Sequence, residues 1–374
     1  MPPITLLIKP ASGACNMRCK YCFYADVMDN RSVSNFGMLS DELHETMVKN
    51  ALAEADGSVT FAFQGGEPTL RGLDFFQRHV QLVEKYNVKK LLVYNTIQTN
   101  GYVIDDQWAS FFAQYNFLVG LSMDGTRAIH DKFRLDSKGK GTYDRVLHCA
   151  KTLDKHKVEY NILCVVNNVV ARNGVKVLKN LIGNGFKYIQ FIPCLDRFND
   201  DIQHDFSLNP KNYAKFLKST FDIYYKYFTE RRLLSIRTFD NYVAMLAGLN
   251  AESCGMNGIC NCYFVVEGNG NVYPCDFYVL DQYLLGNIAT DSFNNLLHSD
   301  NAKKFVRQSL AVDDKCRQCR WFFICRGGCR RNRQTDLNGN LHLNEYCSAF
   351  LEFFPYAFER LQEMARFVKN NQGF

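Results

Sequence analysis

Cysteine content constrains this chain more than any other feature, because fifteen of its 374 residues are cysteines and most of them fall in two tight groups. The sequence begins Met-Pro-Pro-Ile-Thr and lacks the basic and then apolar layout of a signal peptide. We therefore expect a cytoplasmic protein, and disulfide frameworks are rare in that reducing compartment. Metal binding becomes the leading explanation for the cysteines.

Composition excludes several other classes of protein. Hydrophobic residues make up 47% of the chain and charged residues 22%, which is globular usage. No run approaches the roughly 18 apolar residues that a membrane helix needs, so no membrane partner is expected. The net charge of +6 is spread along the chain, and this argues against nucleic acid as a partner.

The first half of the chain alternates short apolar runs with segments of helical period. Such a βα repeat predicts a parallel sheet, closed or partly closed as a barrel, with its site at the carboxyl ends of the strands. The expected strands are Ile4–Ile8, Thr60–Phe63, Leu91–Gln98, Phe117–Ser122, Tyr160–Val166 and Tyr188–Ile192. The expected helices between them are Ser40–Ala55, Leu73–Tyr86, Asp105–Gln114, Thr142–Lys155 and Ala171–Gly183. Cys15, Gln64, Asn100, Ser122 and Leu195 all lie at or just past an expected strand end.

The pattern changes in the last third of the chain. An aromatic helix near Lys211–Tyr227 is followed, from about Arg237, by a segment rich in cysteine and glycine. The stretch Phe264–Tyr273 predicts a β-hairpin with a glycine-rich turn, and Ala349–Val368 predicts a final helix. We expect two domains, residues 1–234 and residues 235–374.

The first cysteine group, Cys15-x3-Cys19-x2-Cys22, follows the first expected strand. Three thiolates can hold three irons of a cubane and leave the fourth iron open, although a zinc knuckle without its fourth ligand is an alternative. The triad, with Tyr21 before its last cysteine, resembles the signature of the radical S-adenosylmethionine (SAM) superfamily. The resemblance implies a partial (β/α)6 barrel and SAM bound at the open iron, where it is cleaved to a 5′-deoxyadenosyl radical.

Further positions match the SAM site of this superfamily. Gln64-Gly65-Gly66-Glu67-Pro68 resembles the GGEP motif that meets the SAM amino group, although by itself it could be an ordinary turn. Ser122 and Arg134 match positions that face the ribose and the carboxylate, and an arginine fork suits a carboxylate. The backbone of Leu195 matches an adenine contact, with core packing as the alternative. The resemblance thus implies SAM contacts from Tyr21, Gln64, Gly65, Gly66, Glu67, Ser122, Arg134 and Leu195.

The second group contains eight cysteines, enough for two closed cubanes or for a pair of zinc ribbons. It resembles the SPASM extension of radical SAM enzymes, which carries two auxiliary four-iron clusters. The resemblance implies one set of Cys254, Cys260, Cys275 and Cys329, and a second set of Cys316, Cys319, Cys325 and Cys347. Together with the first triad this makes three [4Fe-4S] clusters.

Four cysteines remain outside these sets. Cys149 and Cys164 lie on apolar faces and are interpreted as buried small hydrophobic residues. Cys262 is ambiguous because it follows Cys260 by two residues and could replace it as a ligand. Cys194 is left without a role.

The run Val272-Tyr-Pro-Cys-Asp-Phe-Tyr278 and the run Ser253–Gly258 are similar to the anaerobic sulfatase-maturating enzymes. This resemblance implies oxidation of a cysteine or serine, in a Cys/Ser-x-Pro/Ala-x-Arg motif, to Cα-formylglycine after hydrogen abstraction from Cβ. The implied partners are an unfolded or nascent sulfatase and an external electron donor such as flavodoxin or ferredoxin. Asp276 matches the position of the catalytic base, and its alternative role is to cap backbone amides.

Two other functions compete with this one. A SPASM peptide maturase that forms thioether or carbon–carbon crosslinks commonly carries a leader-binding module, for which a first strand at Ile4 leaves no room at the N-terminus. An iron–sulfur electron carrier has no need of an open iron or of a GGEP motif.

Overall fold

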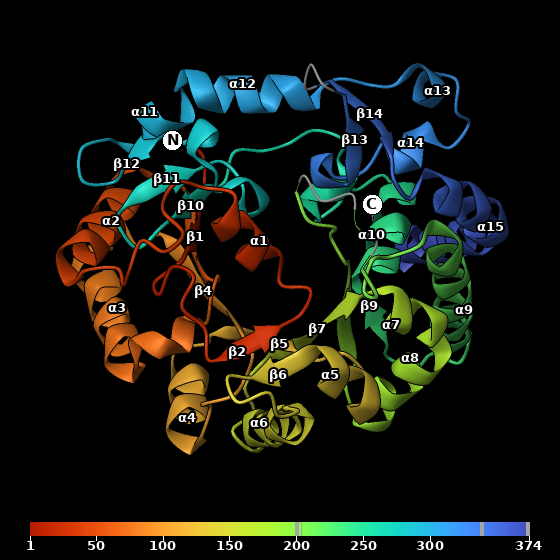
Figure 1. Ribbon diagram of the computed structural model, residues 1–374, viewed down its shortest axis with the longest axis horizontal. Helices are drawn as coiled ribbons and strands as arrows, with labels where there is room; N and C mark the ends of the chain where they lie inside the picture. The colour runs from red at the N-terminus through yellow and green to blue at the C-terminus, as the bar shows by residue number, and fades with distance from the viewer. Residues whose placement is uncertain (199–201, 203, 337–339, 372–374) are drawn as a thin grey trace.

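The six expected strands form the parallel centre of one sheet in the computed structural model, which describes all residues except 199–201, 203, 337–339 and 372–374. They are β1 (Ile4–Ile8), β3 (Ser58–Phe63), β4 (Leu92–Thr99), β5 (Leu118–Ser122), β7 (Tyr160–Val166) and β8 (Tyr188–Pro193). They pair in chain order, and helices cover the outside of the curved sheet (Figure 1). The predicted partial barrel is confirmed.

The covering helices follow the expected positions except at Ala171–Gly183. They are α2 (Asp41–Glu54), α3 (Leu73–Tyr86), α4 (Asp106–Gln114), α5 (Arg127–Phe133), α6 (Tyr143–Lys155), α7 (Asn168–Arg172), α8 (Gly174–Gly183) and α9 (Pro210–Thr229). Of these, α5 is a short helix that the sequence pattern did not predict. The single helix expected at Ala171–Gly183 is wrong, because the chain breaks at Asn173 into α7 and α8. Gly174 begins α8 where an added Cβ would lie 2.7 Å from Phe216 Cδ2, so the break lets α9 pack closely.

The predicted hairpin forms, and it also extends the barrel sheet. Strand β10 (Phe264–Val266) pairs in parallel with β1, and β11 (Asn271–Tyr273) returns antiparallel to β10. Strand β12 (Gly286–Asn287) closes this edge, and β9 (Ser235–Ile236) closes the other edge beside β8. Residues on both sides of the expected boundary at 234/235 therefore share one sheet.

A two-stranded sheet holds the first cysteine loop against the barrel. Strand β2 (Met17–Cys19) pairs with β6 (Arg134–Asp136), and this pairing sets Cys19 opposite Arg134. Helix α1 (Phe23–Asp29) begins directly after Cys22. The cysteine loop is thus tied to the strand that carries Arg134.

The C-terminal third wraps from the hairpin back onto α9. Its longer helices are α10 (Arg237–Leu246), α12 (Asp300–Ser309) and α15 (Cys347–Asn371), with the short α11 (Phe293–Leu297), α13 (Asp314–Arg317) and α14 (Phe322–Cys325) between them. A further hairpin joins β13 (Arg333–Thr335) and β14 (Leu341–Asn344). Helix α15 packs its apolar face on α9 and α10, with Phe353 stacked on Phe239. Within the described residues, every helix is too short or too polar to cross a bilayer.

Candidate active site

The first cysteine loop is docked on the glycine-rich motif that follows β3. The Ala14 carbonyl, next to Cys15, accepts a hydrogen bond of 2.8 Å from the Glu67 amide. Gly66 has φ +53°, and a Cβ there would lie 2.3 Å from the Ala14 carbonyl oxygen and 2.7 Å from that of Ser12. The sequence predicts that the glycines of this motif allow a ligand to approach the backbone. At Gly66, the space that a side chain would take is filled by the chain's own cysteine loop.

Glu67 ties this motif to the turn after β4. Its buried carboxylate accepts hydrogen bonds from Thr69 Oγ1 at 2.7 Å, Thr99 Oγ1 at 2.8 Å and the Asn100 amide at 2.8 Å. Burial raises the pKa of Glu67, and these donors act in the opposite direction. The Glu67 side chain therefore serves to join two loops in this structure, and Asn100 Nδ2 in turn lies 3.7 Å from Cys15 Sγ.

Arg134 is buried beside the same loop and pairs with Asp124. Its Nε lies 3.0 Å from Asp124 Oδ2, and the Tyr21 hydroxyl donates to the same oxygen. The other oxygen of Asp124 accepts the Val165 amide at 3.0 Å. Burial raises the pKa of Tyr21, which keeps its hydroxyl a donor. This network fixes Tyr21 and Arg134 next to Cys19 and Cys22.

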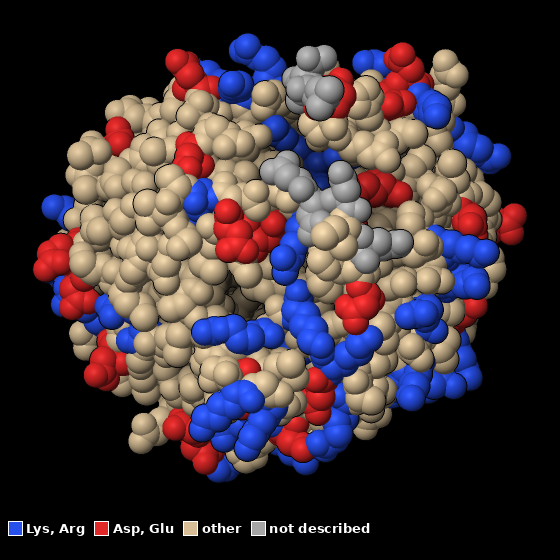
Figure 2. Space-filling model, viewed as in Figure 1, with Lys and Arg blue, Asp and Glu red and all other residues tan. Residues whose placement is uncertain are grey.

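The remaining predicted SAM contacts lie at the same ends of the strands. Gln64 follows β3 directly, Ser122 is the last residue of β5, and Leu195 lies two residues past β8. Ser122 and Leu195 are half-buried, and the Leu195 carbonyl lies 3.8 Å from Cys194 Sγ. The structure thus brings all eight predicted SAM-contact residues to the carboxyl edge of the barrel strands and the loops that cover it. Figure 2 shows this face hollowed near its centre, with Lys and Arg side chains beside the hollow.

Four cysteines of the C-terminal third line one cavity. They are Cys254, Cys260, Cys275 and Cys329, the set implied by the resemblance, although they come from three separate segments. Cys316, Cys319, Cys325 and Cys347 form a second neighbourhood in which the thiols raise one another's pKa after the larger effect of burial. No three His, Cys, Asp or Glu side chains of the described residues are placed to ligate a single ion. A closed four-iron cubane is held by four thiolates, and the four cysteines that line the cavity have the number and chemistry that such a cluster needs.

The other cysteines lie apart from these groups. Cys149, Cys164 and Cys194 are buried in the barrel core, as expected for small hydrophobic residues in the first two cases. The pKa of Cys262 is raised to about 12 by burial alone, and its thiol lies 3.9 Å from the Tyr263 carbonyl. Cys262 is also absent from the residues that line the four-cysteine cavity.

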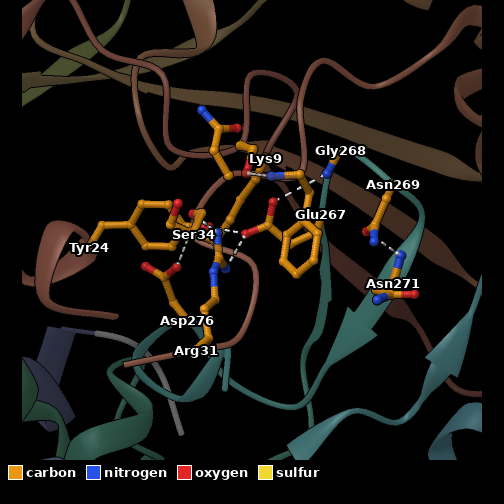
Figure 3. A network of polar contacts seen from close by, with 12 residues as sticks. Lys9, Tyr24, Arg31, Ser34, Glu267, Gly268, Asn269, Asn271 and Asp276 are labelled. Carbon is orange, nitrogen blue, oxygen red and sulfur yellow. Dashed lines mark hydrogen bonds and ion pairs between the residues drawn. The ribbon is translucent and has the colours of Figure 1, made fainter. Parts of the chain in front are cut away.

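Asp276 lies between the first cysteine loop and this cavity. It is 8% exposed and adjacent to Cys275, and one of its oxygens accepts a hydrogen bond from Lys9 Nζ (Figure 3). The other oxygen accepts a hydrogen bond from Gln64 Nε2. Lys9 and Asp276 are also among the charged neighbours of Cys22. The carboxylate is therefore held by the barrel itself, and no backbone amide donor to it is found among the described residues.

Sequence reasoning missed the layer of residues behind Asp276. Lys9 is fully buried with its Nζ 3.8 Å from the centre of the Tyr24 ring, and the Tyr24 hydroxyl donates to Glu267. Arg31 Nη1 lies 2.9 Å from the same Glu267 oxygen (Figure 3). The available signal for Lys9 was a charged residue directly after the apolar run Leu6–Ile8, since a buried lysine requires a partner.

Gly66 offers a test of how the cysteine loop is held. We expect Gly66→Ala to weaken SAM binding at least about tenfold, because backbone strain and displacement of Ala14 together cost more than ~1.4 kcal/mol. SAM dissociation constants and iron content of the reconstituted protein would measure this. Gly72→Ala is the control for backbone strain without a steric clash, since Gly72 has φ +77° and ψ 160° but no atom within 4 Å of the added Cβ. Equal losses in both variants would contradict the role of the close approach.

Comparisons with known proteins agree with this site. A family model of the radical SAM superfamily matches residues 10–175, and one of an iron–sulfur cluster-binding domain matches residues 254–320. The chain is 47% identical over 373 residues, 100% of both chains, to a cysteine-type anaerobic sulfatase-maturating enzyme of Clostridium novyi. It is 30% identical over 389 residues, 99% of this chain and 93% of the relative, to a serine-type enzyme of Bacteroides thetaiotaomicron.

A solved structure completes the comparison. Native anSMEcpe with bound AdoMet and Cp18Cys peptide superposes with a TM-score of 0.95 at 47% identity and covers 98% of this chain and 100% of that one. The full-length match at this identity extends well beyond the two motif regions. The chain therefore belongs to the anaerobic sulfatase-maturating enzymes, within the radical SAM enzymes that carry a cluster-binding C-terminal region.

Proposed function

We propose that this enzyme converts the cysteine of a Cys-x-Pro-x-Arg motif in an unfolded or nascent sulfatase to Cα-formylglycine. The observation that carries the proposal is the position of Asp276 between the Cys15–Cys22 loop and the four-cysteine cavity. Cysteine is favoured over serine because identity is 47% to the cysteine-type relative and 30% to the serine-type one.

The proposed cofactors are SAM and three [4Fe-4S] clusters. Residues 1–234 would hold SAM and the cluster on Cys15, Cys19 and Cys22, and residues 235–374 would hold the two auxiliary clusters on the eight cysteines named above. When bound, these groups supply a 5′-deoxyadenosyl radical that takes hydrogen from the substrate Cβ, and an acceptor for the next electron. Tyr21, Gln64–Glu67, Ser122, Arg134 and Leu195 would then surround SAM.

Asp276 would accept the substrate thiol proton. Loss of a hydrogen atom, an electron and this proton turns the CH2–SH group into a thioaldehyde, and water then releases hydrogen sulfide and leaves the aldehyde. Lys9 and Gln64 each donate a hydrogen bond to one oxygen of Asp276, which fixes the position of the carboxylate, as a general base requires. Tyr24, Glu267 and Arg31 position Lys9 from behind.

Electrons for SAM cleavage would come from an external one-electron donor such as flavodoxin or ferredoxin. Mass spectrometry of a Cys-x-Pro-x-Arg peptide, incubated anaerobically with reconstituted enzyme, SAM and reductant, tests the proposal. We expect a product that reacts with an aldehyde probe, and a tenfold or greater preference over the Ser-x-Pro-x-Arg peptide. Formation of 5′-deoxyadenosine with no change in the cysteine peptide would overturn the substrate assignment, and a crosslinked product would indicate a peptide maturase instead.

A further inference from the structure

Arg330 is a buried arginine for which the described residues provide no carboxylate partner. It follows Cys329 directly in the sequence and is 7% exposed. No Asp or Glu of the described part of the chain forms an ion pair with it. Its terminal nitrogens donate to neutral groups, the Phe305 carbonyl at 3.1 Å, Gln308 Oε1 at 3.0 Å and the Tyr283 hydroxyl at 3.3 Å. Within the described part of the chain, the guanidinium therefore lies in the interior without an Asp or Glu carboxylate beside it.

A buried charge without a counter-ion is costly, so its surroundings are informative. Phe305, Tyr278 and Tyr283 enclose the guanidinium with ring centres at 4.7, 5.0 and 5.5 Å. These rings and the neutral acceptors recover part of the lost hydration, but Arg330 Nε is buried and makes no hydrogen bond. The side chain thus has both an unbalanced charge and an unused donor.

The cavity of the first auxiliary cysteine set lies against this side chain. Arg330 lines it together with Cys254, Cys260, Cys275 and Cys329. A four-iron cluster on four thiolates has a net negative charge in both of its working oxidation states, and charge and hydrogen bonds at the sulfurs set its reduction potential. Such a cluster would supply the anion that Arg330 lacks.

The neighbouring arginines are engaged elsewhere. Arg333 also lines the cavity, but its donors are occupied by backbone carbonyls, including Ala311 at 2.9 Å and Gly258 at 3.1 Å. Arg331 lies 3.7 Å from Asp26 and 3.9 Å from the centre of the Phe198 ring. Arg330 therefore differs from Arg331 and Arg333 in having a buried nitrogen, Nε, without a hydrogen bond among the described residues.

We propose that Arg330 is the counter-ion of the auxiliary cluster nearest Asp276 and raises its reduction potential, so that the cluster accepts the electron released by the substrate radical. This inference rests on the proposed function, because it assumes a cluster on these four cysteines. Arg330 is a positioning and tuning residue, since it acts on the potential of the cluster and does not contact the substrate. The reduced cluster has one more negative charge than the oxidised cluster. The Arg330 guanidinium therefore stabilises the reduced form more, which raises the reduction potential.

The test is a redox titration of the reconstituted full chain followed by electron paramagnetic resonance. Cys15, Cys19 and Cys22 are replaced by alanine in every sample so that only the auxiliary clusters report. We expect Arg330→Gln to lower the equilibrium constant for reduction of one cluster at least about tenfold, which corresponds to about 59 mV for a one-electron couple. Arg330→Lys should keep most of the potential, and Arg331→Gln, which removes the next positive charge along the chain, should change it much less.

The redox titration tests the role of Arg330 independently of the peptide assay that tests the proposed function. An unchanged potential in Arg330→Gln at unchanged iron content would overturn the proposal, whether or not formylglycine is made by the parent enzyme. If Arg330→Gln fails to take up iron, recovery of the iron by Arg330→Lys would support a requirement for the charge. Failure of Arg330→Lys to recover the iron would show that the hydrogen bonds of the guanidinium are needed for folding and would overturn the counter-ion role.

Discussion

Replacing Asp276 with asparagine is expected to lower the rate of formylglycine formation by about 10²- to 10⁴-fold, the usual contribution of a positioned general base. SAM cleavage should continue, because Asp276 is not among the residues that tie the cysteine loop to the barrel. Asparagine has nearly the same shape and can still accept one hydrogen bond from Lys9 or Gln64. The expected loss therefore reports the missing proton acceptor more than a change of packing.

Two products need to be followed in the same reaction. Liquid chromatography would measure 5′-deoxyadenosine, and mass spectrometry would measure the oxidised peptide. Asp281→Asn is the matched control, since Asp281 lies five residues further on and accepts hydrogen bonds only from Ser32 at 2.8 and 3.1 Å among the described residues. Peptide oxidation by Asp276→Asn within about tenfold of the parent rate would rule out Asp276 as the base.

Local patterns predicted most of the barrel. β1 and β7 have the bounds that their apolar runs predicted, and α3 has the bounds that its helical period predicted, because each of these elements has a strong one-faced or fully apolar pattern. The break at Asn173 was missed because both parts keep the helical period. At the end of α7, the Asn173 side chain caps the helix by donating to the Val169 carbonyl at 2.8 Å, and Gly174 packs closely on α9.

Long-range pairings could not be predicted in this way. The parallel pairing of β10 with β1 joins residues 258 positions apart in the chain, such as Ile8 with Val266. Nothing in either segment specifies its neighbour, since both are short and apolar and would fit several edges. This pairing sets the hairpin, and with it Cys275 and Asp276, against the barrel that holds the first cysteine loop.

The site shows the same division between local and distant signals. Cysteine spacing exposed the candidate ligands because three thiols within residues 15–22 and eight more within residues 254–347 are unusual outside metal sites. Lys9, Arg31 and Glu267 remained hidden, because a buried ion pair is recognisable only when both partners are seen together. Their segments lie more than 230 residues apart in the chain, and Glu267 was interpreted only as part of a hairpin turn.

Removal of a single auxiliary thiol should have the second large effect. We expect Cys329→Ala to lose roughly a third of the iron and to abolish peptide oxidation, since it leaves a cavity with three thiolates where a closed cubane needs four. Cys329 is the informative position because its neighbours in sequence, Cys325 and Cys319, belong to the other proposed set. If the cysteines were instead grouped by proximity in the sequence, Cys329 would belong with Cys319 and Cys325. Cys329→Ala would then lose the second auxiliary cluster.

Cys262→Ala is the control for this experiment, because Cys262 is half-buried and near Cys260 yet lies outside the four-cysteine cavity. Its iron content and activity should match those of the parent enzyme. Mössbauer spectra of both variants and of Cys347→Ala would identify which cluster is missing, since Cys329→Ala and Cys347→Ala should lose different subspectra. If these two variants lose the same cluster, or if Cys262→Ala loses as much iron as Cys329→Ala, the proposed assignment of ligands is wrong and the cysteines must be divided in another way.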